Sequence, residues 1–135
     1  MQRLWDLTHA LNVRSKKMAR DLGVTGPQRI VLRTIGMMPG CSATEIAAAL
    51  NMHPSTLTGI LARLLRDKLI ERAVNPDDRR RSHLELTAKG EKIDRERKGT
   101  AEAAIRRALT RADAGVVEAT RHMLALMITE LDRED

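Results

Sequence analysis

The sequence has one cysteine, one aromatic side chain among Phe, Trp and Tyr, and no long uncharged apolar run. Because Cys41 stands alone, an internal disulfide and a multi-cysteine metal site are excluded. Because Trp5 stands alone, the aromatic platforms on which proteins stack single-stranded bases are missing. No segment approaches the roughly 18 apolar residues of a membrane-spanning helix, and the N-terminal stretch lacks the apolar core of a signal peptide. We therefore expect a cytoplasmic protein without a membrane partner.

The charge balance points to a polyanionic partner. The 135 residues carry a formal net charge of +6 at pH 7, and a basic protein gains free energy when it releases counterions from a phosphate backbone. Without stacking side chains, duplex DNA is a better candidate than a single strand. The length fits one domain with its own core, so residues 1–135 are treated as a single domain.

Apolar spacing and capping signals predict four helices in the first half of the chain. The first carries one apolar stripe: Leu4, Leu7, Leu11, Met18 and Leu22. The next two begin at capping boxes, Thr25 with Gln28 and Ser42 with Glu45. The second of the four carries an apolar pattern of its own: Ile30, Val31, Ile35 and Met38. The fourth begins after His53 and is expected to bury one face: Leu57, Ile60, Leu61 and Leu64.

In the second half of the chain, the spacing of apolar residues first changes to that of strands and then returns to that of helices. The segments LIERAV (69–74) and HLELT (83–87) have the character of short strands, and the Asn-Pro-Asp-Asp between them is a turn signal. From Thr87 to about Leu109 the pattern predicts one helix, with its charged section KGEKIDRERK as a solvated face or connecting rod and a bend allowed at Gly99. A last helix begins near Asp113. The fold class is therefore mainly α with a small β-hairpin.

This order of elements is that of a winged helix-turn-helix. A helix fits the major groove of B-DNA, and small side chains in its first turn let the backbone approach base edges; Ser55, Thr56 and Thr58 suit that role. Basic side chains at the tip of the hairpin can enter the narrow minor groove or bind phosphates: Arg79, Arg80 and Arg81. Ser42 and Thr44 lie at a helix N-terminus, where phosphate is also bound.

Two stretches carry a resemblance to a known family. MHPSTLTGILARLLRDKLIER (52–72) and NPDDRRRSHLELTAKG (75–90) resemble the MarR family of bacterial and archaeal transcription regulators over about residues 26–90. The resemblance implies a winged helix-turn-helix DNA-binding lobe at 26–90 and dimerisation helices at 1–24 and 100–135. It further implies a homodimer on a pseudo-palindromic operator, and a repressor relieved by a small-molecule effector of unknown identity.

The resemblance also implies residue roles. Asp78 would orient the wing by pairing with Arg63 on the recognition helix, Arg80 would enter the minor groove, and Arg79 and Arg81 would bind phosphates. We count His53, at the start of the recognition helix, and Arg63, further along it, among the expected DNA contacts. Two positions depart from the family pattern. Lys68 replaces a glycine, which either costs about 1 kcal/mol or marks a different loop. Gly59 stands where relatives carry a larger, often basic, residue.

Several alternatives stay open. The hydroxyl residues of both helix starts could serve only as caps, the three arginines could be a solubilising tip, and the terminal stripes could close a monomeric core. Cys41 is more simply a structural cysteine than a sensor. The four histidines are dispersed, so we expect no metal site. We expect no cofactor and no enzyme, because nucleophile-base motifs and phosphate-binding glycine loops are missing. The rival functions are a non-specific architectural DNA binder and a winged-helix protein-interaction module.

Overall fold

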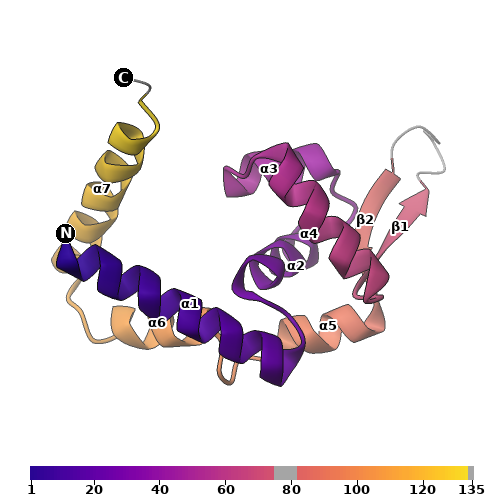
Figure 1. Ribbon diagram of the computed structural model, residues 1–135, viewed down its shortest axis with the longest axis horizontal. Helices are drawn as coiled ribbons and strands as arrows, with labels where there is room; N and C mark the ends of the chain where they lie inside the picture. The colour runs from indigo at the N-terminus through magenta and orange to yellow at the C-terminus, as the bar shows by residue number, and fades with distance from the viewer. Residues whose placement is uncertain (75–81, 134–135) are drawn as a thin grey trace. The chain divides into compact units, whose positions relative to one another are not determined.

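The computed structural model describes residues 1–74 and 82–133 (Figure 1). In these ranges the chain forms, in order, α1 (Gln2–Leu22), α2 (Gly26–Met37), α3 (Ala43–Leu50), α4 (Pro54–Arg66), β1 (Ile70–Val74), β2 (Ser82–Leu86), α5 (Ala88–Arg95), α6 (Ala101–Leu109) and α7 (Ala114–Leu131). The contacts divide the chain into two compact units, Met1–Ala101 and Glu102–Asp135. The first contains the winged helix-turn-helix lobe, expected at residues 26–90, and the second is the C-terminal unit.

Local side-chain chemistry sets the helix starts, and the predicted capping boxes are confirmed. At α2, the Gln28 N–H donates to Thr25 Oγ1 at 3.4 Å and the Thr25 N–H donates to Gln28 Oε1 at 2.8 Å. At α3, Ser42 and Glu45 make the same reciprocal pair. Each box satisfies two N–H groups that lack a partner within the helix.

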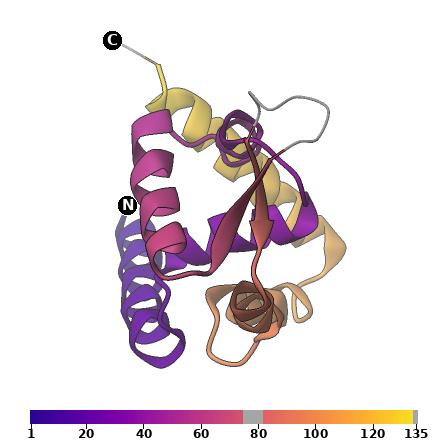
Figure 2. The same cartoon turned by 90° about the vertical axis from the view of Figure 1, so that its right-hand side faces the viewer.

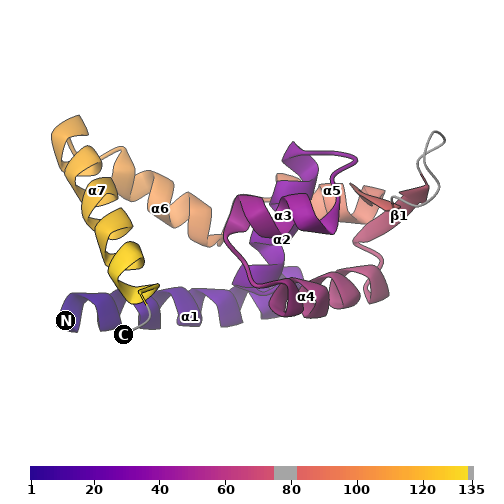
Figure 3. The same ribbon diagram turned by 90° about the horizontal axis from the view of Figure 1, so that it is seen from above.

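The core of the lobe lies between α2, α3, α4 and the hairpin, and α2 packs on both α3 and α4 (Figure 3). Its buried members are Val24, Val31, Leu32, Ile35, Cys41, Ile46, Leu57, Ile60, Leu61, Leu64, Leu69, Ile70 and Leu84. The predicted buried face of α4 is confirmed in full. On α2 the prediction is partly wrong: Ile30 is 47% exposed, while Leu32 and Arg29 are buried. The apolar pattern there left out the side that faces α5.

The hairpin is antiparallel, with Ile70 opposite Leu86 and Val74 opposite Ser82. It packs on α2 and α4 (Figure 2). Strand β1 begins one residue later than predicted and ends as predicted. Strand β2 begins and ends one residue earlier than predicted, and Thr87 caps α5 instead of extending the strand. Cys41 forms an isolated bridge with Leu84, whose N–H donates to the Cys41 carbonyl at 2.9 Å.

Helix α4 is followed by a residue with a left-handed backbone conformation, and this residue is Lys68 and not a glycine. The Leu69 N–H donates to the Leu64 carbonyl at 2.9 Å and the Lys68 N–H to the Leu65 carbonyl at 3.0 Å, which is the Schellman pattern. That pattern needs a positive φ at its C′ residue, and Lys68 has φ of 55°. Of the two alternatives for Lys68, the structure therefore supports the strained residue and not a different loop.

The prediction of one helix from Thr87 to Leu109 is wrong. Helix α5 ends at Arg95, residues 96–100 are not helical, and α6 begins at Ala101. Within the break Gly99 has φ of 77°, a value that favours glycine. Asp94 is also largely buried and pairs with Arg33, so the charged section is more than a solvated face.

The helices of the C-terminal unit bury none of their residues. The predicted start of α7 is confirmed: Asp113 accepts from the Val116 N–H at 2.9 Å. Large apolar side chains are nevertheless exposed along both helices: Ile105, Leu109, Val116, Met123, Leu124, Leu126, Ile128 and Leu131. Helix α1 has the same character over its N-terminal part, where Leu4, Leu7 and Leu11 are exposed, and it buries only Met18. Among the described residues, no helix is long and apolar enough to cross a membrane.

Candidate nucleic-acid interface

Helix α4 separates a buried face from a face of small side chains. Its leucine and isoleucine residues lie in the core, and the other face is exposed over residues that sequence analysis assigned to DNA or noted as unusual: Ser55, Thr56, Thr58, Gly59 and Arg63. A Cβ added at Gly59 would have no neighbour within 4 Å. The exposed face therefore has a low profile near its N-terminal end and a cation, Arg63, further along.

His53 caps α4, and this cap orients Ser55. The Ser55 N–H donates to His53 Nδ1 at 3.3 Å, and Ser55 Oγ lies 2.7 Å from the same nitrogen. In the tautomer in which Nδ1 accepts, the ring proton is on Nε2 and the Ser55 hydroxyl donates to Nδ1. Ser55 Oγ then offers lone pairs outward, which match the amino groups of adenine N6 and cytosine N4 in the major groove.

Thr58 is oriented in a similar way. Its hydroxyl donates to the Pro54 carbonyl at 2.8 Å, so its remaining capacity is as an acceptor. Thr56 is exposed between these two residues. The helix start thus presents acceptors from Ser55 and Thr58 beside the donor Nε2–H of His53, all on exposed residues.

Ser42 and Thr44 differ from one another. The Ser42 hydroxyl accepts from the Glu45 N–H at 3.3 Å and donates to Glu45 Oε2 at 2.7 Å. The capping alternative therefore accounts for Ser42, and the Glu45 carboxylate beside it opposes a phosphate at this position. Thr44 is exposed in the first turn of α3 and keeps its place as a candidate contact.

The predicted wing residues Asp78, Arg79, Arg80 and Arg81 lie outside the described residues. What the structure does describe is the pair of strands on either side of them, from Ile70 to Val74 and from Ser82 to Leu86. Residues 75–81 thus connect β1 to β2 in a hairpin that packs on α4.

Cys41 has the environment of a structural residue. Its side chain is 5% exposed, and burial, together with a smaller effect of the Glu45 charge, raises the pKa of the thiol against the lowering effect of a backbone hydrogen bond. A raised pKa keeps the thiol protonated and unreactive near neutral pH. Within the described ranges, no cluster of His, Cys, Asp or Glu could hold a metal ion.

Sequence reasoning missed Arg29. This side chain is 1% exposed and donates to backbone carbonyls at the end of α5. The available signal was its position three residues before the buried Leu32, which places it on the apolar side of α2. Arginine is seldom buried without partners. The partners of Arg29 lie more than 60 residues away in sequence, so its burial could not be predicted.

Comparisons with known proteins agree with this architecture. A sequence model of the MarR family matches residues 22–81. The transcriptional regulator HosA of Escherichia coli O111:H- is 39% identical over 70 residues, which cover 52% of this chain and 52% of HosA. The chain thus spans about half the length of the curated relatives it matches first.

Two solved structures extend the likeness beyond the matched segment. The crystal structure of a MarR family transcription regulator is 28% identical, covers 96% of this chain and 83% of that one, and has a TM-score of 0.68. The Staphylococcus aureus MepR–DNA complex is 22% identical, covers 97% and 96%, and has a TM-score of 0.79, which shows a shared fold. The sequence match, the capped α4 and the hairpin that follows it show a segment like that of the MarR family at residues 22–81 of this chain.

Proposed function

We propose that this chain is a sequence-specific, double-stranded DNA-binding transcriptional regulator. In this proposal it acts as a homodimer on a pseudo-palindromic operator, as a repressor relieved by a small-molecule effector. The observation that carries the DNA-binding part is the exposed, low-profile face of α4, with oriented hydrogen-bonding groups at its start. Such a face fits the width of the major groove and reads base edges there. The net charge of +6 supports attraction to the DNA backbone.

Each expected residue except Ser42, which caps α3, has a role in this proposal. His53, Ser55, Thr56 and Thr58 contact base edges or the nearest phosphates, and Thr44 contacts a phosphate at the start of α3. Around the wing, Arg80 enters the minor groove, and Arg79 and Arg81 bind phosphates on either side. Asp78 pairs with Arg63 and thereby fixes the wing against α4.

The exposed apolar faces support a homodimer. Helix α7 carries five large apolar side chains that are 42–53% exposed, as well as Leu131, and α1 adds Leu4, Leu7 and Leu11. Contiguous apolar patches of this kind mark interaction sites on soluble proteins. A twofold dimer would carry two copies of α4 and match two half-sites about one DNA turn, roughly 34 Å, apart.

Relief by an effector is proposed on the family resemblance alone, and no residue of this chain is assigned to it. An effector that binds better to dimers with a different spacing of the two α4 helices would shift the population toward them. Affinity for DNA would then fall because both half-sites cannot be contacted together, without any direct block of the contacts.

The first experiment selects binding sites from a random duplex library and titrates the selected sites against salt for the wild type and Arg80→Ala. We expect a pseudo-palindrome. We also expect Arg80→Ala to bind more weakly and to lower the salt slope by about 0.9, the value for one phosphate-neutralising charge. The matched control is Arg95→Ala, which removes an equal charge from an exposed side chain on α5 that pairs with Glu91.

Three outcomes would contradict parts of the proposal. Salt-sensitive binding without an enriched sequence would favour an architectural DNA binder. Failure to bind any duplex would favour a winged-helix protein-interaction module. Equal losses in Arg80→Ala and Arg95→Ala would mean that general charge, and not the wing, governs affinity.

Asp78→Ala separates the wing-orienting role from simple charge. The substitution raises the net charge from +6 to +7, which alone would strengthen binding to DNA. We expect weaker binding instead, because the wing would lose its partner on α4. The control Glu118→Ala makes the same charge change on the exposed surface of α7; if both variants bind DNA more tightly, Asp78 does not orient the wing.

A further inference from the structure

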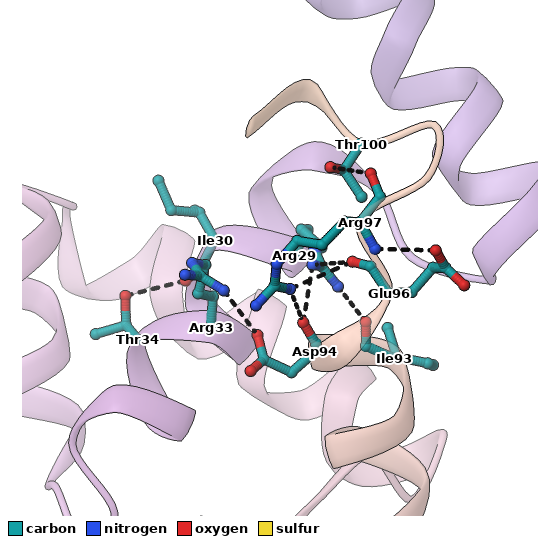
Figure 4. A network of polar contacts seen from close by, with 9 residues as sticks. All are labelled: Arg29, Ile30, Arg33, Thr34, Ile93, Asp94, Glu96, Arg97 and Thr100. Atoms are coloured by element: carbon teal, nitrogen blue, oxygen red, sulfur yellow. Dashed lines mark hydrogen bonds and ion pairs between the residues drawn. The ribbon is translucent and has the colours of Figure 1, made fainter. Parts of the chain in front are cut away.

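The break between α5 and α6 is held by an arginine from α2. Arg29 is 1% exposed, and Figure 4 shows its guanidinium pointing at the end of α5. It donates to the carbonyls of Ile93, of Asp94 at 3.1 Å and of Glu96 at 2.7 Å. One side chain thus binds three carbonyl oxygens within four consecutive residues.

These carbonyls need such a partner because the helix stops there. The last carbonyls of a helix have no N–H partner further along the chain, and a buried carbonyl without a partner is costly. A guanidinium offers several N–H donors in a fixed plane. Its positive charge also faces the negative end of the α5 dipole, which favours a cation at this position.

Further contacts tie down the residues that follow, which we call the exit segment (residues 96–100). Arg97 donates to the carbonyls of Asp94 and Glu96, and Arg14 of α1 donates to the Gly99 carbonyl at 3.5 Å. The buried Thr100 donates to the Arg97 carbonyl at 2.9 Å. The exit segment is therefore connected to α1 and α2.

The Glu96 carboxylate closes the first turn of this segment. It accepts from the Lys98 N–H at 2.7 Å and the Arg97 N–H at 2.9 Å. These two backbone hydrogen bonds, the one from Lys98 first, lower the pKa of the carboxyl. An ionised Glu96 is also a favourable neighbour for the Arg29 guanidinium, whose charge contributes to the lowered pKa.

We propose that Arg29 is a positioning residue for DNA binding: by holding the end of α5 and the exit segment, it fixes where the chain leaves the unit Met1–Ala101. The inference rests on the proposed function, because it assigns to Arg29 the spacing at which a homodimer presents its two α4 helices. The Arg33–Asp94 ion pair, 3.6 Å apart, binds a side chain of α5 and no backbone carbonyl, so it cannot substitute for Arg29 in holding the helix end.

The test has two parts, both on the full chain. The first measures hydrogen exchange of the exit-segment amides without DNA in the wild type and in Arg29→Met, which keeps an unbranched side chain and removes the donors. We expect about tenfold faster exchange, the factor implied by the loss of a hydrogen bond to a charged donor. Arg95→Met, which removes a charge from an exposed side chain at the end of α5, should exchange like the wild type.

The second part measures affinity for a series of duplexes whose two half-sites are separated by increasing numbers of base pairs. We expect the wild type to prefer one spacing and Arg29→Met to lose that preference, so that the ratio of affinities at good and poor spacings falls toward one. Weaker folding alone would lower affinity at every spacing and leave this ratio unchanged.

Each outcome decides the proposal. Unchanged or slower exchange in Arg29→Met, or an unchanged spacing preference, would overturn it. If Arg29→Met does not fold, Arg29→Lys decides in its place, because it keeps the charge and loses the planar fork; it must show the same two effects. If the wild type binds no duplex, the proposed function fails, while the exchange experiment still tests whether Arg29 holds the exit segment.

Discussion

The helices of the winged helix-turn-helix lobe and of the C-terminal unit have similar apolar patterns, but only the lobe buries its apolar side chains. The lobe has one cluster of buried apolar residues whose members are at most 8% exposed. Helix α7 repeats apolar residues over 18 positions and buries none of them. Burial of apolar area is the main favourable contribution to folding, so the lobe is stabilised by its own core, whereas α7 leaves its apolar side chains exposed. Helix α1 shows both behaviours, with Met18 buried and Leu4 to Leu11 exposed.

The largest expected effect is on the face that the chain leaves uncovered. Leu124 on α7 is 42% exposed, and in a dimer interface Leu124→Glu would place a charge without a partner among apolar side chains. We expect the variant to have the mass of one 15.1 kDa chain in sedimentation, and to bind a pseudo-palindromic duplex about 100-fold more weakly, because the second half-site no longer binds in the same event. The lobe should still unfold cooperatively.

Ala125→Glu is the control for that substitution. Ala125 is exposed on the same helix, and one position places it about 100° around the axis from both Leu124 and Leu126. We expect it to remain a dimer. If Leu124→Glu still forms dimers that bind DNA with normal affinity, α7 is not the dimer interface. The exposed apolar side chains of α7 would then need another explanation.

Two helical glycines of the lobe differ in the space around them: Gly90 is closely packed, and Gly59 has no neighbour within 4 Å of an added Cβ. A Cβ at Gly90 would lie 2.0 Å from the Leu69 carbonyl oxygen, so Gly90→Ala must push α5 away from the start of β1. We expect a loss of about 1–3 kcal/mol in the free energy of unfolding. Gly59→Ala has open space and should gain about 0.5–1 kcal/mol through helix propensity. Chemical denaturation measures both, and equal signs would contradict the packing described here.

The fold could be predicted where the cause is local. Capping boxes join side chains and backbone within four residues, so Thr25 and Ser42 revealed their helix starts. The period of α4 revealed its buried face, and with it the exposed side chains of the candidate interface. Strand β2 ends one residue earlier than predicted, because Thr87 has both strand character and the hydroxyl of an N-cap.

Long-range causes could not be predicted. The break after α5 depends on Arg29, which lies 64 to 67 residues before the carbonyls it binds, and the charged sequence around it resembles a solvated helix. The orientation of Ser55 was missed for a different reason. The orientation of Ser55 depends on the His53 side chain, which caps α4. Histidine is not among the usual capping residues. The roles of Asp78 and Arg79 to Arg81 rest on the family resemblance and stay predictions.

A smaller effect is expected at the end of α4, where the lobe tolerates strain. Lys68 has φ of 55° in a Schellman motif, a conformation that glycine adopts without a steric penalty. Lys68→Gly should therefore raise the free energy of unfolding by up to about 1 kcal/mol. The exposed control Lys89→Gly, within α5, should lower it by about as much. A loss in both variants would show that Lys68 contributes more through its side chain than it costs through its backbone.

The smallest expected effect uses Cys41, the only thiol in the chain, to report on the packing of the lobe alone. Burial raises the pKa of this thiol in the folded protein, whereas in the unfolded chain it titrates near the ordinary value of about 8.5. The stability due to the protonated, buried thiol is fully present below the unfolded pKa and is lost as the pH rises from there through the folded pKa, because the unfolded chain releases the proton first. The difference in unfolding free energy between the wild type and Cys41→Ala should thus be constant at neutral pH and shift against the wild type at alkaline pH. The two proteins share every other titrating group. If the difference in unfolding free energy stays constant through this pH range, the thiol is exposed to water in the folded protein and the packing around Cys41 is not as described.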